Sequence, residues 1–182
     1  MTLDISKTAC FTGHRPNVFV DNNKFKDYNE AEFNIKKLLT KSIIAAHTEL
    51  HIINFISGGA VGVDQWAVEC VLELKNEYPQ FKLIIARPFP SQHIRWPIHV
   101  QDEYHEILKK ADEVVSVSED PYAAWKMHVR NEYMVNNSQL VIAVKYPEVT
   151  SGGTSACLQY AIRKTRTIWE INPRTEVINY IY

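Results

Sequence analysis

Two glycine-rich stretches carry the residue types and spacing that would suit an anion. They are SGGAVGVD, residues 57–64, and SGGTS, residues 151–155. Each follows an apolar run and precedes a segment with helical spacing, so each is expected to place free backbone N–H groups at a helix N-terminus. Such an N-terminus carries partial positive charge and suits a phosphate or a carboxylate. A tight turn without a ligand is the alternative for either stretch alone, whereas two such turns favour a phosphate-bearing ligand.

Two carboxylates accompany the first glycine stretch, Asp64 and Glu69. Asp64 could accept hydrogen bonds from ribose hydroxyls, or it could only stabilise the helix dipole, by about 0.3–1 kcal/mol. Glu69 lies more than one turn farther along the expected helix, so a packing or solvated role is the alternative to a catalytic one. Neither stretch is a G-x-G-x-x-G fingerprint or a Walker loop, since no Lys-Ser/Thr pair follows.

The segment TGHRP, residues 12–16, follows the first expected strand. Arg15 suits bidentate recognition of a phosphate, with a surface ion pair as the alternative. His14 could donate a hydrogen bond or act as a general acid, although a structural histidine is commoner. In the second glycine stretch, Thr154 could cap its helix or donate to a phosphate.

An aromatic segment, RPFPSQHIRW, spans residues 87–96. Phe89 and Trp96 could stack on a base while Gln92 reads its edge, because base–aromatic stacking contributes about 1–3 kcal/mol per base. The alternative is an aromatic loop that closes over the core. Trp66 is expected to pack in the core.

The segment RNEYMVNNS, residues 130–138, adds Arg130 and Asn131 on a helix whose apolar spacing is loose. Some of its residues are therefore expected to point away from the core. An ion pair of Arg130 with Asp112 or Glu132 is the alternative to a role in the site. Asn137 is expected to cap the end of this helix.

Length, charge and cysteine content limit the class of protein to which this chain can belong. A chain of 182 residues predicts one domain, residues 1–182, and a net charge of -1 without a basic stripe disfavours nucleic acid and anionic lipid as partners. The three cysteines lie far apart in apolar segments, so neither a disulfide framework nor a metal site is expected. No signal peptide and no run of roughly 20 apolar residues is evident, so we expect a cytoplasmic protein that does not enter membranes.

Apolar runs alternate with segments of helical spacing along the whole chain, which predicts an α/β fold with a mostly parallel sheet and helices on both faces. In such folds ligands bind at the carboxyl ends of the strands. The loops after the first, second, third and fifth expected strands are therefore predicted to form one site. Strands are expected over residues 8–12, 51–57, 82–87, 113–117, 139–145, 167–171 and 176–181, and helices over 25–47, 60–78, 101–111, 122–136 and 154–164.

Five segments together resemble the YpsA-like proteins of the SLOG superfamily, to which the LOG phosphoribohydrolases and the DprA core also belong. They are CFTGHRP, ISGGAVGVDQWAVE, RPFPSQHIRW, RNEYMVNNSQLVIAV and GGTSACLQYA, in this order. The resemblance implies a Rossmann-like three-layer sandwich and a site for nucleotides or nucleotide-derived ligands. By the same analogy, a homodimer is expected.

One position departs from the LOG pattern P-G-G-x-G-T-x-x-E, in which the glutamate serves catalysis. Cys157 stands at the corresponding place, and Thr154 directly follows Gly153. Phosphoribohydrolase activity of the LOG type is therefore in doubt, and Glu69 and Asp64 are the remaining catalytic candidates.

These patterns predict a module that binds a nucleotide-derived small molecule, such as ADP-ribose, an NAD-like species or a nucleoside phosphate, as sensor, carrier or sequestering protein. The alternative is an enzyme that hydrolyses or transfers at the N-glycosidic bond of a nucleotide. A bound nucleotide or ADP-ribose-like molecule is the only cofactor that the sequence suggests. The expected ligand-binding residues are Thr12, Gly13, His14, Arg15, Ser57, Gly58, Gly59, Gly62, Asp64, Gln65, Pro88, Phe89, Gln92, Trp96, Arg130, Asn131, Gly152, Gly153 and Thr154.

Overall fold

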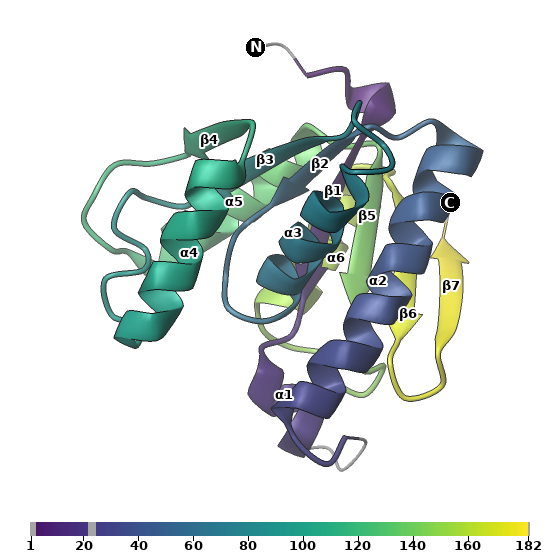
Figure 1. Cartoon of the computed structure of the whole chain (residues 1–182), viewed down its shortest axis with the longest axis horizontal. Coiled ribbons are helices and arrows are strands. Elements are labelled where there is room, and N and C mark those ends of the chain that lie inside the picture. Colours follow the sequence, from purple (N-terminus) through teal and green to yellow (C-terminus); the bar gives the residue numbers. More distant parts are fainter. Residues whose placement is uncertain (1–2, 22–24, 182) are drawn as a thin grey trace.

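A seven-stranded sheet in the order β4-β3-β2-β1-β5-β6-β7 forms the centre of the molecule (Figure 1). The computed structural model describes residues 3–21 and 25–181. Neighbouring strands are parallel except for β7, which runs antiparallel to β6. The strands are β1 (Thr8–Gly13), β2 (Asn54–Ser57), β3 (Lys82–Arg87), β4 (Glu113–Ser116), β5 (Leu140–Val144), β6 (Thr167–Asn172) and β7 (Val177–Ile181).

Helices cover both faces of this sheet, and each face has its own apolar core. In Figure 1, α2, α3 and α4 lie in front of the sheet, and α5 and α6 lie behind it. The front core contains Phe11, Phe55 and Ile142 from the strands, and the rear core contains Cys10, Ile56 and Val141. This alternation follows from the strand repeat of two residues. The helices are α1 (Pro16–Asp21), α2 (Tyr28–Leu50), α3 (Val63–Leu74), α4 (Ile98–Lys110), α5 (Ala124–Asn136) and α6 (Gly153–Arg163), with a short 3-10 helix, η1 (Ile5–Lys7).

The chain reverses its direction across the sheet beside β1. From β1 it proceeds through β2 and β3 to β4, with the connecting helices in front, and then returns through α5 behind the sheet to β5. Strands β1 and β5 are hydrogen-bonded neighbours. The loops that follow β1, β2 and β5 consequently emerge side by side at one edge, where open α/β sheets bind their ligands.

The predicted α/β fold, with a mostly parallel sheet and helices on both faces, is confirmed. The strand predicted over residues 82–87 matches β3, whereas the strand predicted to begin at residue 51 begins at Asn54, because His51 takes a left-handed conformation (φ 57°) that ends α2. Helix α3 is shorter than the predicted 60–78 because the glycine loop continues through Gly62. Helix α1 was not predicted, since six residues beginning at a proline carry little periodic signal.

Within the described residues no helix has both the length and the apolar character needed to cross a bilayer. The cysteines Cys10, Cys70 and Cys157 are buried and form no disulfide.

Candidate functional site

The loop between β2 and α3 is closed by the side chain of Arg130 on α5. The Arg130 Nη1 donates a hydrogen bond of 2.8 Å to the carbonyl oxygen of Gly58. A Cβ atom at Gly58 would lie 1.8 Å from this same Nη1, so Gly58 is required for Arg130 to occupy its place. The first glycine stretch therefore holds a guanidinium of the protein itself against its backbone.

Asp64 lies beneath this guanidinium and is buried. Its Oδ2 lies 3.8 Å from the Arg130 Nη1 and accepts a 3.4 Å hydrogen bond from the backbone N–H of Ala60. Burial raises the pKa of Asp64, and the charge of Arg130 opposes this rise. The predicted alternative partners of Arg130 were wrong, since Asp112 binds Lys75 at 2.7 Å and Glu132 forms no ion pair with Arg130.

The same loop is held by further internal hydrogen bonds. The Ser57 hydroxyl donates to the carbonyl of Asp64 at 2.8 Å and accepts from the N–H of Gly59 at 3.1 Å. The Gln65 Nε2 donates to the carbonyl of Gly59 at 3.2 Å. Gly62 has φ 103°, and a Cβ there would lie 2.9 Å from the Cδ of Pro16, so this glycine lets the β1 loop pack against the start of α3.

The residue after Arg130 connects this loop to the second glycine stretch. The Arg130 Nε donates to the Asn131 Oδ1 at 2.9 Å, and the Asn131 Nδ2 donates to the carbonyl of Gly153 at 3.4 Å. We call the contacts of Arg130 and Asn131 with Gly58, Asp64 and Gly153 the loop junction. It places both predicted glycine stretches at one edge of the sheet.

The second glycine stretch, in contrast, is open. A Cβ at Gly152 or Gly153 would meet nothing within 4 Å, and Gly152 has φ 90°. No side chain caps the first turn of α6, so the predicted capping role of Thr154 is wrong. Thr154 is nevertheless only 6% exposed. The first turn of α6 thus has room and free N–H groups for an anion.

The loop after β1 lies between the two glycine stretches. Gly13 approaches α3 so closely that a Cβ would lie 2.5 Å from Val63. Burial, together with the charge of Lys145, lowers the pKa of His14 to about 4, so this imidazole is neutral at pH 7. The His14 Nε2 is buried and has no hydrogen-bond partner among the described residues. Arg15 is exposed, and its charge, like that of Arg130, opposes the rise that burial causes in the pKa of Asp64.

The aromatic segment after β3 packs into the protein. Phe89 is 2% exposed and meets the ring of Tyr122 edge to face, at 5.8 Å between centroids. Trp96 meets Tyr104 in the same way, at 5.2 Å. The Gln92 Nε2 donates to the Tyr104 hydroxyl at 2.6 Å and to the carbonyl of Gly58 at 3.3 Å. The remaining expected residues of this edge, Thr12 and Pro88, are buried.

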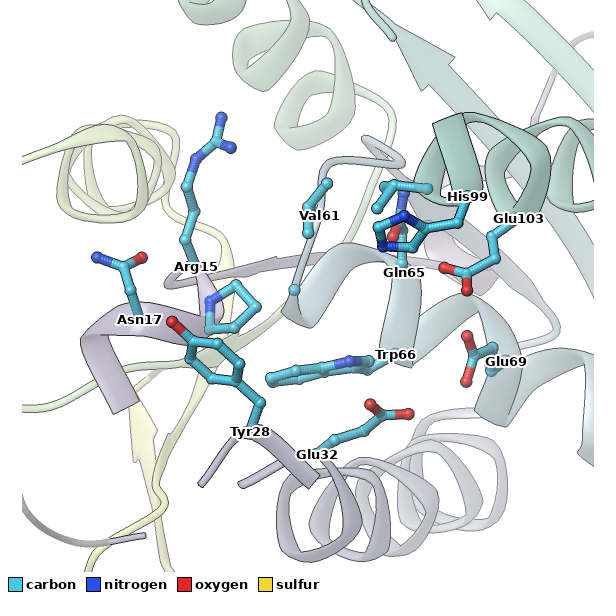
Figure 2. A pocket seen from close by; sticks show the side chains of 13 residues that line it. Arg15, Asn17, Tyr28, Glu32, Val61, Gln65, Trp66, Glu69, His99 and Glu103 are labelled. Atoms are coloured by element: carbon cyan, nitrogen blue, oxygen red, sulfur yellow. The ribbon is translucent and has the colours of Figure 1, made fainter. Parts of the chain in front are cut away.

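A cavity of about 540 Å³ lies beside the N-terminus of α3, on the front face of the sheet. Of the predicted residues it brings together Arg15, Gly62, Gln65 and the catalytic candidate Glu69 (Figure 2). The other predicted residues lie outside its lining. The sequence did not indicate that α1, α2 and α4 contribute lining residues, because their sequence patterns are those of ordinary helices. The lining residues from α1, α2 and α4 are Pro16, Asn17, Tyr28, Glu32, His99, Val100 and Glu103, and the glycine loop and α3 add Val61 and Trp66.

Carboxylates gather at one end of the cavity. The Lys36 Nζ lies 2.8 Å from the Glu69 Oε2 and 3.9 Å from the Glu32 Oε1. Burial and the neighbouring Glu69 raise the pKa of Glu32, while Lys36 lowers it. Glu103 adds a further repulsive charge and forms no ion pair within the described part of the chain. Groups of three or more metal-ligating side chains with suitable geometry do not occur among the described residues.

Solved structures of DNA processing protein A share this fold. The protein from Streptococcus pneumoniae superposes with a TM-score of 0.60 at 18% identity, covering 91% of this chain and 50% of that chain. The protein from Helicobacter pylori, described for its single-stranded DNA binding mode, gives 0.58 at 17% identity, covering 94% of this chain and 67% of that chain. At these identities the similarity shows the fold alone.

Sequence comparison decides the family. A family model described as the YspA SLOG family, YpsA, matches residues 9–175. The chain belongs to the YpsA SLOG family. Among relatives, a UPF0398 protein of Brevibacillus brevis is 34% identical over 142 residues, covering 77% of this chain and 74% of the relative. The uncharacterized SPbeta prophage-derived protein YoqJ of Bacillus subtilis is 35% identical over 159 residues, covering 80% of this chain and 91% of YoqJ.

In this member of the YpsA family, the residue at the position of the LOG glutamate is an unreactive cysteine, Cys157. Cys157 is 1% exposed, and burial raises the pKa of its thiol to about 11. A thiolate is the nucleophilic form of cysteine, so Cys157 supplies no nucleophile near pH 7. Of the two catalytic candidates, Glu69 lines the cavity, whereas Asp64 is buried against Arg130.

Proposed function

We propose that this protein binds a nucleotide-derived small molecule, such as ADP-ribose, an NAD-like species or a nucleoside phosphate, as sensor, carrier or sequestering module. The loop junction carries the proposal, because it fixes both glycine stretches at the sheet edge while leaving the first turn of α6 open. Membership of the YpsA SLOG family supports it, since SLOG domains generally bind ligands derived from nucleotides.

The phosphate of the ligand would bind between the first turn of α6 and Arg15. Arg130 already donates to Gly58 and Asn131, whereas Arg15 is exposed and lies on the loop after β1, between the two glycine stretches. Figure 2 shows the Arg15 side chain directed away from Trp66, and Arg15 is one of the residues that line the cavity. A guanidinium and a helix N-terminus are both favourable partners for a phosphate.

A nucleotide-cleaving enzyme is the second candidate. One observation favours it: Glu32 and Glu69 face the same cavity and lie within 4 Å of the same Lys36 ammonium. Cleavage of an N-glycosidic bond resembles glycoside hydrolysis, in which a pair of carboxylates serves as acid and as base or nucleophile. Release of free base from AMP or of nicotinamide from NAD, lost in Glu69→Gln, would support this candidate.

The test is a thermal unfolding series with NAD, ADP-ribose, AMP and ribose 5-phosphate, followed by chromatography of each mixture. A ligand at 100 times its Kd stabilises the native state by about 2.7 kcal/mol. We expect at least one member of the panel to raise the unfolding temperature and to be recovered intact. Arg15→Ala should weaken this effect without lowering the stability of the free protein.

Arg95→Ala is the matched control, because Arg95 is also exposed and lies outside both the loop junction and the cavity lining. It should bind like the unmodified protein. A panel without any effect on unfolding would overturn the proposed function, and equal binding by Arg15→Ala would place the phosphate elsewhere.

A further inference from the structure

The cavity beside α3 is divided by charge. Figure 2 shows Arg15 and Asn17 at one end and the carboxylates of Glu69 and Glu103 at the other. Trp66 lies between the two ends. Tyr28 lies near the end with Arg15 and Asn17, and Glu32 lies below the ring of Trp66. A ligand that fills the cavity must therefore present different chemistry at its two ends.

The carboxylate end offers hydrogen-bond acceptors, and the imidazole of His99 lies beside Glu103 in Figure 2. Among the described residues, no lysine or arginine that is free of an ion pair lines the cavity at this end. The Lys36 Nζ forms an ion pair with the Glu69 Oε2 at 2.8 Å, whereas Glu103 has no ion-pair partner within the described part of the chain. An ionised carboxylate only accepts hydrogen bonds. A phosphate at this end would meet like charge, so it is excluded from here and directed toward Arg15.

Gln65 adds an uncharged acceptor to the wall of the cavity. It is 6% exposed, lines the cavity and uses its Nε2 on the carbonyl of Gly59. Its amide oxygen accepts no hydrogen bond from any described residue. This amide oxygen is an acceptor at the cavity wall that a ligand N–H group can reach.

Aromatic rings complete the wall. Tyr28 is 55% exposed and offers a free ring surface, whereas Trp66 is 6% exposed and packs against Phe19 at 6.0 Å between ring centroids. Aromatic side chains bind planar rings by stacking. The combination of flat apolar surface and surplus acceptors suits a planar ring with N–H groups on its edge.

We propose that this cavity binds the base of the nucleotide and selects bases that carry an exocyclic amino group. The inference rests on the proposed function, since Arg15 and the first turn of α6 hold the phosphate. It adds that the carboxylate end, principally Glu103 and Glu32, accepts the N–H groups of the base. The exposed ring of Tyr28 positions the base.

The experiment compares ligands that differ by one amino group. Calorimetric titration of the full chain is done with AMP and purine riboside 5′-monophosphate, with GMP and IMP, and with ribose 5-phosphate. The loss of one hydrogen bond to a charged group weakens binding by on the order of tenfold. We expect AMP or GMP to bind about tenfold more tightly than its partner without the amino group.

Two variants assign the preference to the cavity. Glu103→Ala should reduce the preference for the amino group to less than about threefold and leave the affinity for ribose 5-phosphate unchanged. Because Glu103 is exposed, this variant is expected to fold. Glu32→Gln, which keeps the shape of the side chain, should act in the same direction. Glu49→Gln, an exposed change near the far end of α2, is the control and should keep the full preference.

The outcomes separate this inference from the proposed function. Binding of ribose 5-phosphate and of all nucleotides with equal affinity would overturn the base selection and leave the phosphate site standing. A preference that survives unchanged in Glu103→Ala and Glu32→Gln would also overturn the inference. Absence of binding by every ligand would overturn both.

Discussion

The loop junction and the cavity beside α3 lie on either side of the same glycine loop, yet they are built in opposite ways. At the junction, Arg130 donates to Gly58 and to Asn131 and lies above a buried Asp64. In the cavity, Glu103 and the amide oxygen of Gln65 have no partner within the described part of the chain. A glycine-rich stretch can therefore mark a place that the protein fills with its own side chain, while the room for a ligand lies beside it.

Arg130→Met should produce the largest change. Removal of one partner from a buried ion pair costs about 3–5 kcal/mol, because the other charge stays buried. For a chain of this length the unfolding temperature should fall by on the order of 10 °C. Chemical denaturation measures this loss, with exposed Arg163→Met as control. An Arg130 variant as stable as the control would mean that the junction does not hold the loops.

The two glycine stretches should respond differently to a single methyl group. Gly58→Ala places a Cβ 1.8 Å from the Arg130 Nη1 and should cost about 1–3 kcal/mol, the usual cost of overpacking. Gly153→Ala places its Cβ in open space and should leave stability unchanged within about 0.5 kcal/mol. It should nevertheless weaken binding of the phosphate. Equal losses of stability in both variants would contradict the contrast between a filled and an open loop.

The pH dependence of stability should reflect the protonation of His14. An unperturbed imidazole has a pKa of 6.5, whereas burial lowers that of His14 to about 4. Between these values the unfolded chain binds a proton that the folded chain does not, so stability is present above pH 6.5 and is lost as the pH falls toward 4. Denaturation at several pH values should show a shallower fall in His14→Leu. The same fall in this variant as in exposed His128→Leu would contradict the assignment.

The ion pair of the cavity should matter least for stability. Lys36 and Glu69 have side chains that are 24% and 42% exposed, against 9% and 10% for Arg130 and Asp64. Partly exposed pairs contribute about 0–1 kcal/mol. Lys36→Met should therefore change the free energy of unfolding by less than about 1 kcal/mol in chemical denaturation. A loss of unfolding free energy as large as that of Arg130→Met would mean that this ion pair stabilises the protein as much as the buried pair of the loop junction does.

Much of the fold could be predicted because strands that are buried on both faces alternate with amphipathic helices. Both patterns are local and survive in a single sequence. The sequence also indicated that Arg130 and Asn131 belong with the glycine stretches. It could not indicate that Arg130 fills the space over Gly58, because this contact joins residues 72 positions apart.

The cavity could not be predicted for a similar reason. Tyr28, Glu32 and Glu103 lie on α2 and α4, where exposed polar and aromatic residues are typical of any solvated helix face. Only their packing around α3 brings them together with Trp66 and Glu69. Glu69 was noticed because it lies on the same helix as the first glycine stretch.

A crystal structure of the protein with bound AMP tests the central claim most directly. We predict the phosphate beside Arg15 and the backbone N–H groups of Gly153 and Thr154, with the adenine ring in the cavity near Tyr28 and its amino group directed at Glu103. A phosphate among the carboxylates, or a nucleotide bound away from this edge of the sheet, would contradict the account.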